Sequence, residues 1–379
     1  MAFIRRPAAV VTSYYRPKPG GLCPRMFRAL RALLGAGHTV HYLSVERFPI
    51  EHPRCHFHRF PWPPRHTDTP LFWAVFLCMA PLLLFWLSLR HRANVLLSFD
   101  PAYAMAMQPA RLLPRRRLLL FLRADTVVNQ RIKGRPGWLV RLWEMLEGLA
   151  VWRAEVVGVC APVLDAVLAR HRLLAPAHSS VLHNDLPVPS WDSGVMAGET
   201  LRLACVGTLE ARKNQALVLE ALAGAGTGAW RLDVYGDGPA RAGLERLAAD
   251  RGLGGRVRFH GWVQREAIWQ NTDVLLLPSL HEGMSNAMLE ALAGGVAVLA
   301  SDVPEHRDVL PAASLLPPLV PQAWAARLRS LVADRRLLEA LRTEQAAAAR
   351  RLRFDWDAAV VRLVAGTDTE RPVAHAGTL

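Results

Sequence analysis

The stretch Pro278–Gly295, with the sequence PSLHEGMSNAMLEALAGG, directly follows the apolar run DVLLL at residues 273–277. A short apolar run of this kind is typical of a buried parallel strand, and Ser285 or Asn286 can cap the helix that follows it. A helix that begins at a strand end presents free backbone N–H groups there, and such groups bind phosphate. Gly283 lets a ligand approach the backbone closely. The stretch therefore predicts an α/β fold with an anion site at this strand end.

Two carboxylates flank the predicted turn: Glu282 precedes the helix and Glu290 lies within it. In this position they can accept hydrogen bonds from the hydroxyl groups of a ligand bound at the turn. The alternative is a solvated glutamate on each side of an ordinary strand–helix connection. Spacing alone does not separate the two interpretations.

Outward from this stretch, short apolar strands alternate with helical segments in both halves of the chain. This alternation predicts parallel sheets covered on both faces. A stretch rich in proline, serine and glycine, residues 186–200, reads as a linker. We expect an N-terminal Rossmann-like domain at 1–185, a C-terminal one at 201–365 and a frayed tail at 366–379. A ligand would bind in the cleft between the two doubly wound domains.

The 379 residues carry a formal net charge of +14, with 51% hydrophobic residues. The charge favours an anionic partner: nucleic acid, an acidic membrane surface or a phosphorylated substrate. No zinc-finger spacing or aromatic RNA-binding strand is present, so we expect no nucleic acid partner. The five cysteines are widely spaced and contain no C-x-x-C pair, which argues against disulfides and a zinc site and fits a reducing cytoplasm.

The segment Leu71–Leu89, LFWAVFLCMAPLLLFWLSL, contains no charged residue. It is nearly as long as a membrane-spanning helix, which needs about 20 apolar residues. Three interpretations remain open: a helix buried in the first domain, a monotopic helix dipping into one leaflet, or a true span. A span would split the first domain across the membrane, so a partly embedded helix is preferred.

An ordered series of motifs fills the second half: VGTLxxRKN at Val206–Asn214, YGDGP at Tyr235–Pro239, RVRFHG at Arg256–Gly261 and ASDVPE at Ala300–Glu305. Together with Asp273–Gly295, they resemble the family 4 retaining glycosyltransferases of the two-domain GT-B fold. In the first half, Gly20-Gly21 and the GHTV at Gly37–Val40 match more weakly. The resemblance implies a sugar transferred from a nucleotide sugar, of UDP or GDP type, with retention of configuration.

The resemblance also implies roles for individual residues. Glu282 would contact the donor sugar near the reacting carbon, Glu290 would hold the ribose, and Lys213 would neutralise the leaving diphosphate. Because breaking the sugar–phosphate bond separates charge, cations and N–H groups on one side and a carboxylate on the other stabilise the transition state. No D-x-D metal signature follows a predicted strand, so no metal or other cofactor is expected. The remaining donor-binding candidates are Gly20, Gly21, Gly207, Thr208, Arg212, Gly236, Gly283, Met284, Ser285 and Asn286.

Two departures from the family pattern stand out. Thr208 occupies a position where the family often has arginine, so a diphosphate contact is missing unless Arg212 supplies it. Where the family often has a histidine after a first-domain strand, Arg123 or Asp125 follows instead. Asp125 is our catalytic candidate there, and a buried ion pair or a helix cap is its alternative role.

The apolar helix and the basic first half both fall on the acceptor side, which suits a lipid-linked or saccharide acceptor at an anionic membrane. The favoured interpretation is a cytoplasmic glycosyltransferase, peripheral or monotopic on the inner face of the cell membrane. A non-catalytic, nucleotide-sugar-binding partner of the same fold is the main alternative. A nucleotide-sugar epimerase is a further one.

Overall fold

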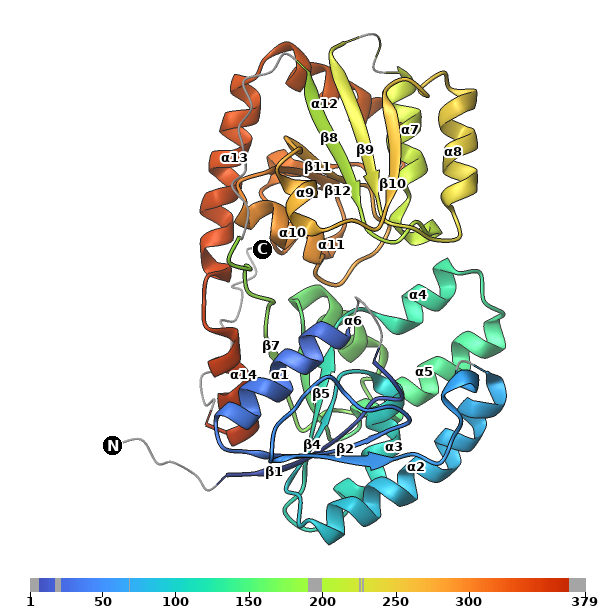
Figure 1. The fold of residues 1–379 in the computed structure, drawn as a ribbon, viewed down its shortest axis with the longest axis vertical. Helices are drawn as coiled ribbons and strands as arrows, with labels where there is room; N and C mark the ends of the chain where they lie inside the picture. Colours follow the sequence, from blue (N-terminus) through green and yellow to red (C-terminus); the bar gives the residue numbers. More distant parts are fainter. Residues whose placement is uncertain are drawn as a thin grey trace. The chain divides into compact units, whose positions relative to one another are not determined.

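The computed structural model describes residues 7–17, 22–67, 69–189, 200–224, 226 and 228–367, in two compact units (Figure 1). Unit 1 comprises residues 1–125, 136–183 and 355–379, and unit 2 comprises residues 126–135 and 184–354. The predictions for Gly20 and Gly21, for most of the linker and for all but the first two residues of the tail concern residues outside the described ranges.

Unit 1 is built on a seven-stranded sheet whose strand pairs are all parallel, in the order β3-β2-β1-β4-β5-β6-β7. The strands are β1 Ala9–Ser13, β2 Thr39–Ser44, β3 Cys55–Arg59, β4 Val95–Ser98, β5 Arg117–Leu122, β6 Glu155–Gly158 and β7 His178–Val181. The helices are α1 Cys23–Gly35, α2 Pro70–Arg90, α3 Pro101–Arg111, α5 Gly137–Val151, α6 Ala161–Arg170 and α14 Trp356–Ala365. Since the strand order reverses at β1 and β4, right-handed crossovers place α1 on one face and α2, α3 and α5 on the other.

Unit 2 repeats this design with six parallel strands in the order β10-β9-β8-β11-β12-β13. Its strands are β8 Leu201–Val206, β9 Trp230–Tyr235, β10 Val257–Gly261, β11 Val274–Leu277, β12 Ala297–Ser301 and β13 Leu315–Leu316. Its helices are α4 Thr126–Ile132, α7 Gln215–Gly224, α8 Arg241–Asp250, α9 Arg265–Trp269, α10 Asn286–Ala293, α11 Pro304–Arg307, α12 Pro321–Ala333 and α13 Arg336–Ala349. The expected pair of doubly wound α/β units is confirmed.

The C-terminal helix corrects the expected domain boundary, because α14 belongs to unit 1 and not to the second domain. It packs on α1, where the guanidinium groups of Arg25 and Arg28 lie 4.8 and 5.1 Å from the ring centre of Trp356. Arg117 also donates to the carbonyl oxygens of Leu363 and Val364, at 3.1 and 2.9 Å, and so binds the last turn of the helix. Residues 126–135, including the unanticipated α4, belong to unit 2.

Helix α2 begins where Thr69 accepts a hydrogen bond from the Phe72 amide, with Pro70 at the first helical position. One face of α2 is buried, and its buried side chains recur every three or four residues: Phe72, Phe76, Ala80, Leu84 and Leu87. The helix packs against α3 within unit 1. Among the described residues, α2 is the helix long and apolar enough to cross a membrane, with a mean hydropathy of 2.2. A third of that apolar window is buried, while Leu71, Leu82, Trp86 and Leu89 are each more than half exposed.

Candidate active site

The candidate site in unit 2 gathers at the carboxyl ends of β8, β9 and β11. The sequence places Lys213 in the short 3-10 turn Ala211–Lys213 after β8, and Glu282 in the connection from β11 to α10. The ammonium of Lys213 lies 2.5 Å from Oε1 of Glu282. Arg212 donates to Oε2 of the same carboxylate at 3.0 Å, and Ser279 donates to Oε1 at 2.8 Å. One buried carboxylate therefore holds two cations in place.

The charge state of Glu282 follows from these contacts. Burial opposes its ionisation, but the charges of Lys213 and Arg212 outweigh that effect and lower the pKa of the carboxyl to about 2. Glu282 is thus an anion at neutral pH. Glu210 also pairs with Arg212 at 2.8 Å, so two carboxylates hold two cations in position here.

Arg212 has three hydrogen-bond partners in this cluster. It donates to the carbonyl oxygen of His281 at 3.0 Å and to Glu210 at 2.8 Å, besides its bond to Glu282. Burial opposes its charge, while Glu282 and Glu210 raise its pKa, so the guanidinium stays charged. Thr208, by contrast, is exposed, and its backbone carbonyl accepts from Gln215. Arg212 is therefore the charged side chain at this turn, and its contact with a diphosphate stays a prediction.

Two glycines shape the backbone beside Lys213. Gly236, after β9, has φ of +118°, and a Cβ added there would lie 2.1 Å from the carbonyl oxygen of Gly207. Only glycine permits this approach between the two loops. A Cβ at Gly207 would in turn lie 3.7 Å from the Lys213 ammonium. Gly207 therefore lies directly beside the charged end of the lysine.

Helix α10 begins as expected, with Ser285 accepting from the Met288 amide at 3.5 Å. Gly283 and Met284 are buried, Met284 accepting from the Asn184 amide through its sulfur at 3.2 Å, while Asn286 is exposed in the first turn. The first amides of a helix have no partner within it, so this end can bind an anion. The expected strand–turn–helix is thus present beside the cationic cluster.

Glu290 lies one turn into α10 and is half-buried. Trp269 donates its indole N–H to Oε2 of Glu290 at 3.1 Å, and Arg265 approaches Oε1 at 3.9 Å. Burial raises the pKa of Glu290, although Trp269 and Arg265 act in the opposite direction. The two glutamates therefore lie in different environments: Glu282 forms ion pairs with Lys213 and Arg212, and Glu290 accepts a hydrogen bond from the indole of Trp269.

Asp125 lies in unit 1 and is buried. Its carboxylate binds Arg170, which also binds Glu147 at 2.5 Å, and Glu147 contacts the ring of His171 at 2.9 Å. The pKa of Arg170 is raised because Asp125 and Glu147 together outweigh the cost of its burial. This network corresponds to the ion-pair alternative for Asp125, and its catalytic role stays a prediction.

The sequence did not point to four other side chains of the site. Ser279 and Trp269 bind Glu282 and Glu290, and His281 contacts Glu305 through Nδ1 at 2.7 Å. His306 is buried, and its Nδ1–H donates to the carbonyl oxygen of Ser301, 2.8 Å away. Within the described residues its Nε2 has no hydrogen-bond partner. Ser279 could have been found from spacing, because it lies three residues before Glu282. Trp269 could not, because it lies on a separate helix, α9.

Known proteins are similar to the part of the chain that carries these residues. Residues 200–334 match the family model described as "Glycosyl transferases group 1". The chain is 31% identical over 142 residues to the lipopolysaccharide 1,6-galactosyltransferase of Escherichia coli, which is 35% of this chain and 39% of that protein. It is 37% identical over 98 residues to the lipopolysaccharide core biosynthesis glycosyltransferase LpsE of Rhizobium meliloti, 25% and 28% of the two chains. These curated relatives are thus matched over less than half of their length.

Solved structures match over nearly the whole chain. Sucrose-phosphate synthase of Thermosynechococcus elongatus aligns with a TM-score of 0.76 and 19% identity, covering 94% of this chain and 97% of that one. The Anabaena protein HepE, in complex with UDP and glucose, aligns with a TM-score of 0.70 and 15% identity, covering 95% and 99%. At these identities the likeness concerns the fold, which is GT-B. The residues that match the group 1 glycosyltransferase model, 200–334, lie within unit 2.

Proposed function

We propose that this chain is a glycosyltransferase that moves a sugar from a nucleotide-sugar donor to an acceptor at a membrane. The observation that carries the proposal is the buried cluster in which Glu282 holds Lys213 and Arg212 beside the start of α10. The cluster lies within residues 200–334, which match the group 1 family model. Both the geometry and the comparison therefore favour the same class of reaction.

The chemistry of the cluster fits a diphosphate leaving group. As the sugar–phosphate bond breaks, negative charge grows on the diphosphate, and the cations and helix N–H groups stabilise it. Lys213 and Arg212 would then do what a metal ion does elsewhere. Glu282 keeps both cations oriented before the donor arrives, so little reorganisation is needed. Stereochemical retention rests on the resemblance to the family 4 enzymes.

Glu290 is proposed to hold the ribose of the donor. Its bond to Trp269 uses one lone pair of Oε2, so further acceptor positions on the carboxylate are available to ribose hydroxyls. The Anabaena neighbour was solved with UDP and glucose. A UDP-type donor is accordingly the first candidate, and a GDP-type donor is the second.

Donor binding can be tested by thermal shift, because a ligand that binds the folded state raises the unfolding temperature. The native chain would be screened with UDP, GDP, CDP and the corresponding sugar nucleotides. We expect one diphosphate series to raise the unfolding temperature and Lys213→Met to remove most of that rise. Equal shifts for native chain and variant would contradict donor binding at this cluster.

A membrane acceptor is supported by the outer surface of unit 1. Apolar side chains on α5 and at its C-terminal cap recur at helical spacing and are each at least 38% exposed: Trp138, Leu142, Met145, Leu149 and the cap residue Trp152. Helix α2 adds Leu82 and Trp86, at 73% and 54% exposure. Both helices pack against α3, in one layer over the sheet (Figure 1). We call these seven side chains the α2–α5 apolar surface, and exposed apolar side chains gathered in this way suit contact with a membrane.

Basic side chains accompany this surface. The guanidinium groups of Arg111 and Arg153 lie 5.2 and 5.9 Å from the ring centre of Trp152, and Arg90 and Arg141 are exposed on α2 and α5. Apolar side chains with a basic rim suit the interface of an anionic bilayer, where tryptophan is also favoured. We therefore place the chain peripherally or monotopically on the cytoplasmic face of the cell membrane, with a lipid-linked or saccharide acceptor.

The alternative is a non-catalytic, nucleotide-sugar-binding partner of the same fold. The exposed Thr208, at the position where the family often has arginine, favours it. A nucleotide-sugar epimerase of the same fold is a further alternative. It differs from a glycosyltransferase because it would convert the donor sugar without any acceptor. Chromatography of the sugar nucleotides after incubation separates the three cases: transfer, conversion, or binding without turnover.

A further inference from the structure

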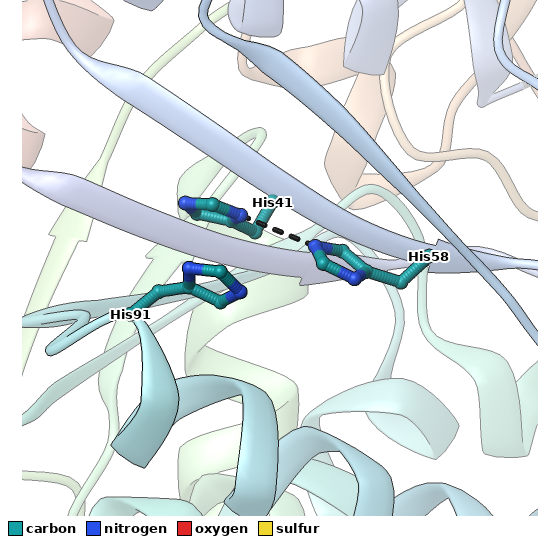
Figure 2. A group of neighbouring side chains, drawn as sticks. All are labelled: His41, His58 and His91. Carbon is teal, nitrogen blue, oxygen red and sulfur yellow. Dashed lines mark hydrogen bonds between the residues drawn. The ribbon is translucent and has the colours of Figure 1, made fainter.

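A group of histidines lies in unit 1, apart from the residues assigned to the donor. His41 is on β2, His58 is on the neighbouring edge strand β3, and His91 ends helix α2 (Figure 2). Each offers one ring nitrogen, and these three nitrogens lie within 4.8 Å of one another. Residues far apart in the sequence therefore converge on one point.

The strand register explains this convergence. His41 pairs with His56, and Leu43 pairs with His58, so His41 and His58 lie on the same face of two adjacent strands. Nδ1 of His41 and Nε2 of His58 are 3.2 Å apart, and the rings of His41 and His91 stack with centres 3.8 Å apart. His41 is buried, while His58 and His91 are half-buried, so the group is reachable from solvent.

We propose that His41, His58 and His91 bind a zinc ion, or another divalent metal that prefers imidazole ligands. Zinc–nitrogen bonds of about 2.0–2.1 Å in a tetrahedral site place the ligand nitrogens about 3.3 Å apart. The separation of 3.2 Å between His41 and His58 already matches that value. His91 completes the set once its nitrogen moves inward by about 1.5 Å, which requires its ring to rotate out of the stack with His41.

The surroundings allow a fourth ligand. The three histidines line a pocket of about 700 Å³, together with Arg47, Glu51 and Cys55 among others. A water molecule has room at the open coordination position, as in zinc sites with three protein ligands. The metal would connect the end of the apolar helix α2 to the edge of the sheet. Its role would then be to fix the helix that carries part of the α2–α5 apolar surface.

Metal binding is measured on the full chain, purified without a histidine tag and treated with chelator, by titration calorimetry with Zn²⁺. We expect one equivalent to bind, and Zn²⁺ to raise the unfolding temperature. His58→Gln and His91→Gln should each weaken binding at least 10-fold, since even the loss of an outer-shell partner costs roughly 10- to 100-fold. The exposed His178→Gln, on β7 of the same unit, should bind zinc like the native chain.

A second measurement needs no variant and so does not depend on whether the variants fold. Diethylpyrocarbonate acylates neutral imidazole nitrogens, and bound Zn²⁺ should protect His58 and His91 but not His178, as mapped by mass spectrometry of peptides. Equal modification with and without Zn²⁺, or unchanged binding by His58→Gln and His91→Gln, would overturn the proposal. The outcome is independent of donor binding in unit 2.

Discussion

The ammonium of Lys213 and the carboxylate of Glu282 are 2.5 Å apart, although 69 residues separate them along the chain. Their side chains are only 13% and 7% exposed. Arg212 binds the other oxygen of the same carboxylate at 3.0 Å and also pairs with Glu210 at 2.8 Å, so Glu282 connects the two neighbouring cations. The stability and the chemistry of the site both depend on this arrangement.

Replacing Glu282 by glutamine keeps the shape of the side chain but removes the charge that holds Lys213 and Arg212. Leaving partly buried cations without their anion is strongly destabilising, and we expect Glu282→Gln to lower the free energy of unfolding by about 3 kcal/mol. Urea denaturation at neutral pH measures this loss. The matched control is Glu344→Gln on α13, an exposed carboxylate in the same unit, which should change stability by less than about 0.5 kcal/mol.

The same pair predicts a pH dependence. The pKa of Glu282 falls from an ordinary 4.5 to about 2 in the folded chain. Its contribution to stability is therefore complete above pH 4.5 and is lost as the pH falls towards 2. The difference in unfolding free energy between the native chain and Glu282→Gln should narrow from about 3 kcal/mol as the pH is lowered through this range. A difference that stays constant between pH 7 and 3 would contradict the assigned charge state.

Lys213 is expected to act on the donor phosphates. Because a hydrogen bond to a charged group contributes about 1.5–3 kcal/mol, Lys213→Met should weaken the binding of the preferred nucleoside diphosphate by roughly 10- to 100-fold. Lys213→Arg should retain part of the affinity. Calorimetry would compare both with Arg246→Met, which removes an exposed cation on α8. Unchanged affinity in Lys213→Met would remove the lysine from the donor site.

The two-unit α/β fold could be predicted because short apolar strands and helices alternate along the sequence. The boundary could not be predicted at α14, since Trp356 and Arg117 bind this helix to unit 1 through contacts that are distant in sequence. For the same reason, spacing pointed to Glu282 and Glu290 as a pair but not to Trp269, which reaches Glu290 from α9.

The histidine group shows a further limit of sequence patterns. His41, His58 and His91 are 17 to 50 residues apart and form no recognised metal motif, so only the pairing of β2 with β3 and the end of α2 brings them together. Strand register is set by packing across the whole sheet, and a single strand does not reveal its partner's register.

Gly236 should tolerate no side chain. A Cβ there would lie 2.1 Å from the carbonyl oxygen of Gly207, at a φ of +118°, so Gly236→Ala must displace one of the two loops. We expect a loss of more than about 2 kcal/mol in unfolding free energy together with weaker nucleotide binding. Gly243→Ala is the matched control, because this glycine lies in α8 with no atom near the added Cβ, and alanine should stabilise the chain by about 0.5–1 kcal/mol.

The α2–α5 apolar surface predicts membrane binding that depends on its apolar side chains. The triple variant Leu82→Ser, Trp86→Ser and Met145→Ser should reduce sedimentation with anionic phosphatidylglycerol vesicles at least about 10-fold, because each buried apolar side chain contributes about 1.5 kcal/mol or more. Leu173→Ser, which changes a 99% exposed leucine of unit 1 outside this surface, should bind as the native chain does. Equal sedimentation of a folded triple variant would refute the membrane assignment.

The most direct test is the release of nucleoside diphosphate from a panel of sugar nucleotides, with and without a membrane lipid extract as the source of acceptor. We predict that the native chain turns over one donor series, faster with the extract. Glu282→Gln should be slower by roughly 100-fold or more, since the groups that stabilise the leaving diphosphate lose their orientation. Turnover that Glu282→Gln retains in full, or nucleotide binding by the native chain without turnover of any donor, would contradict the account.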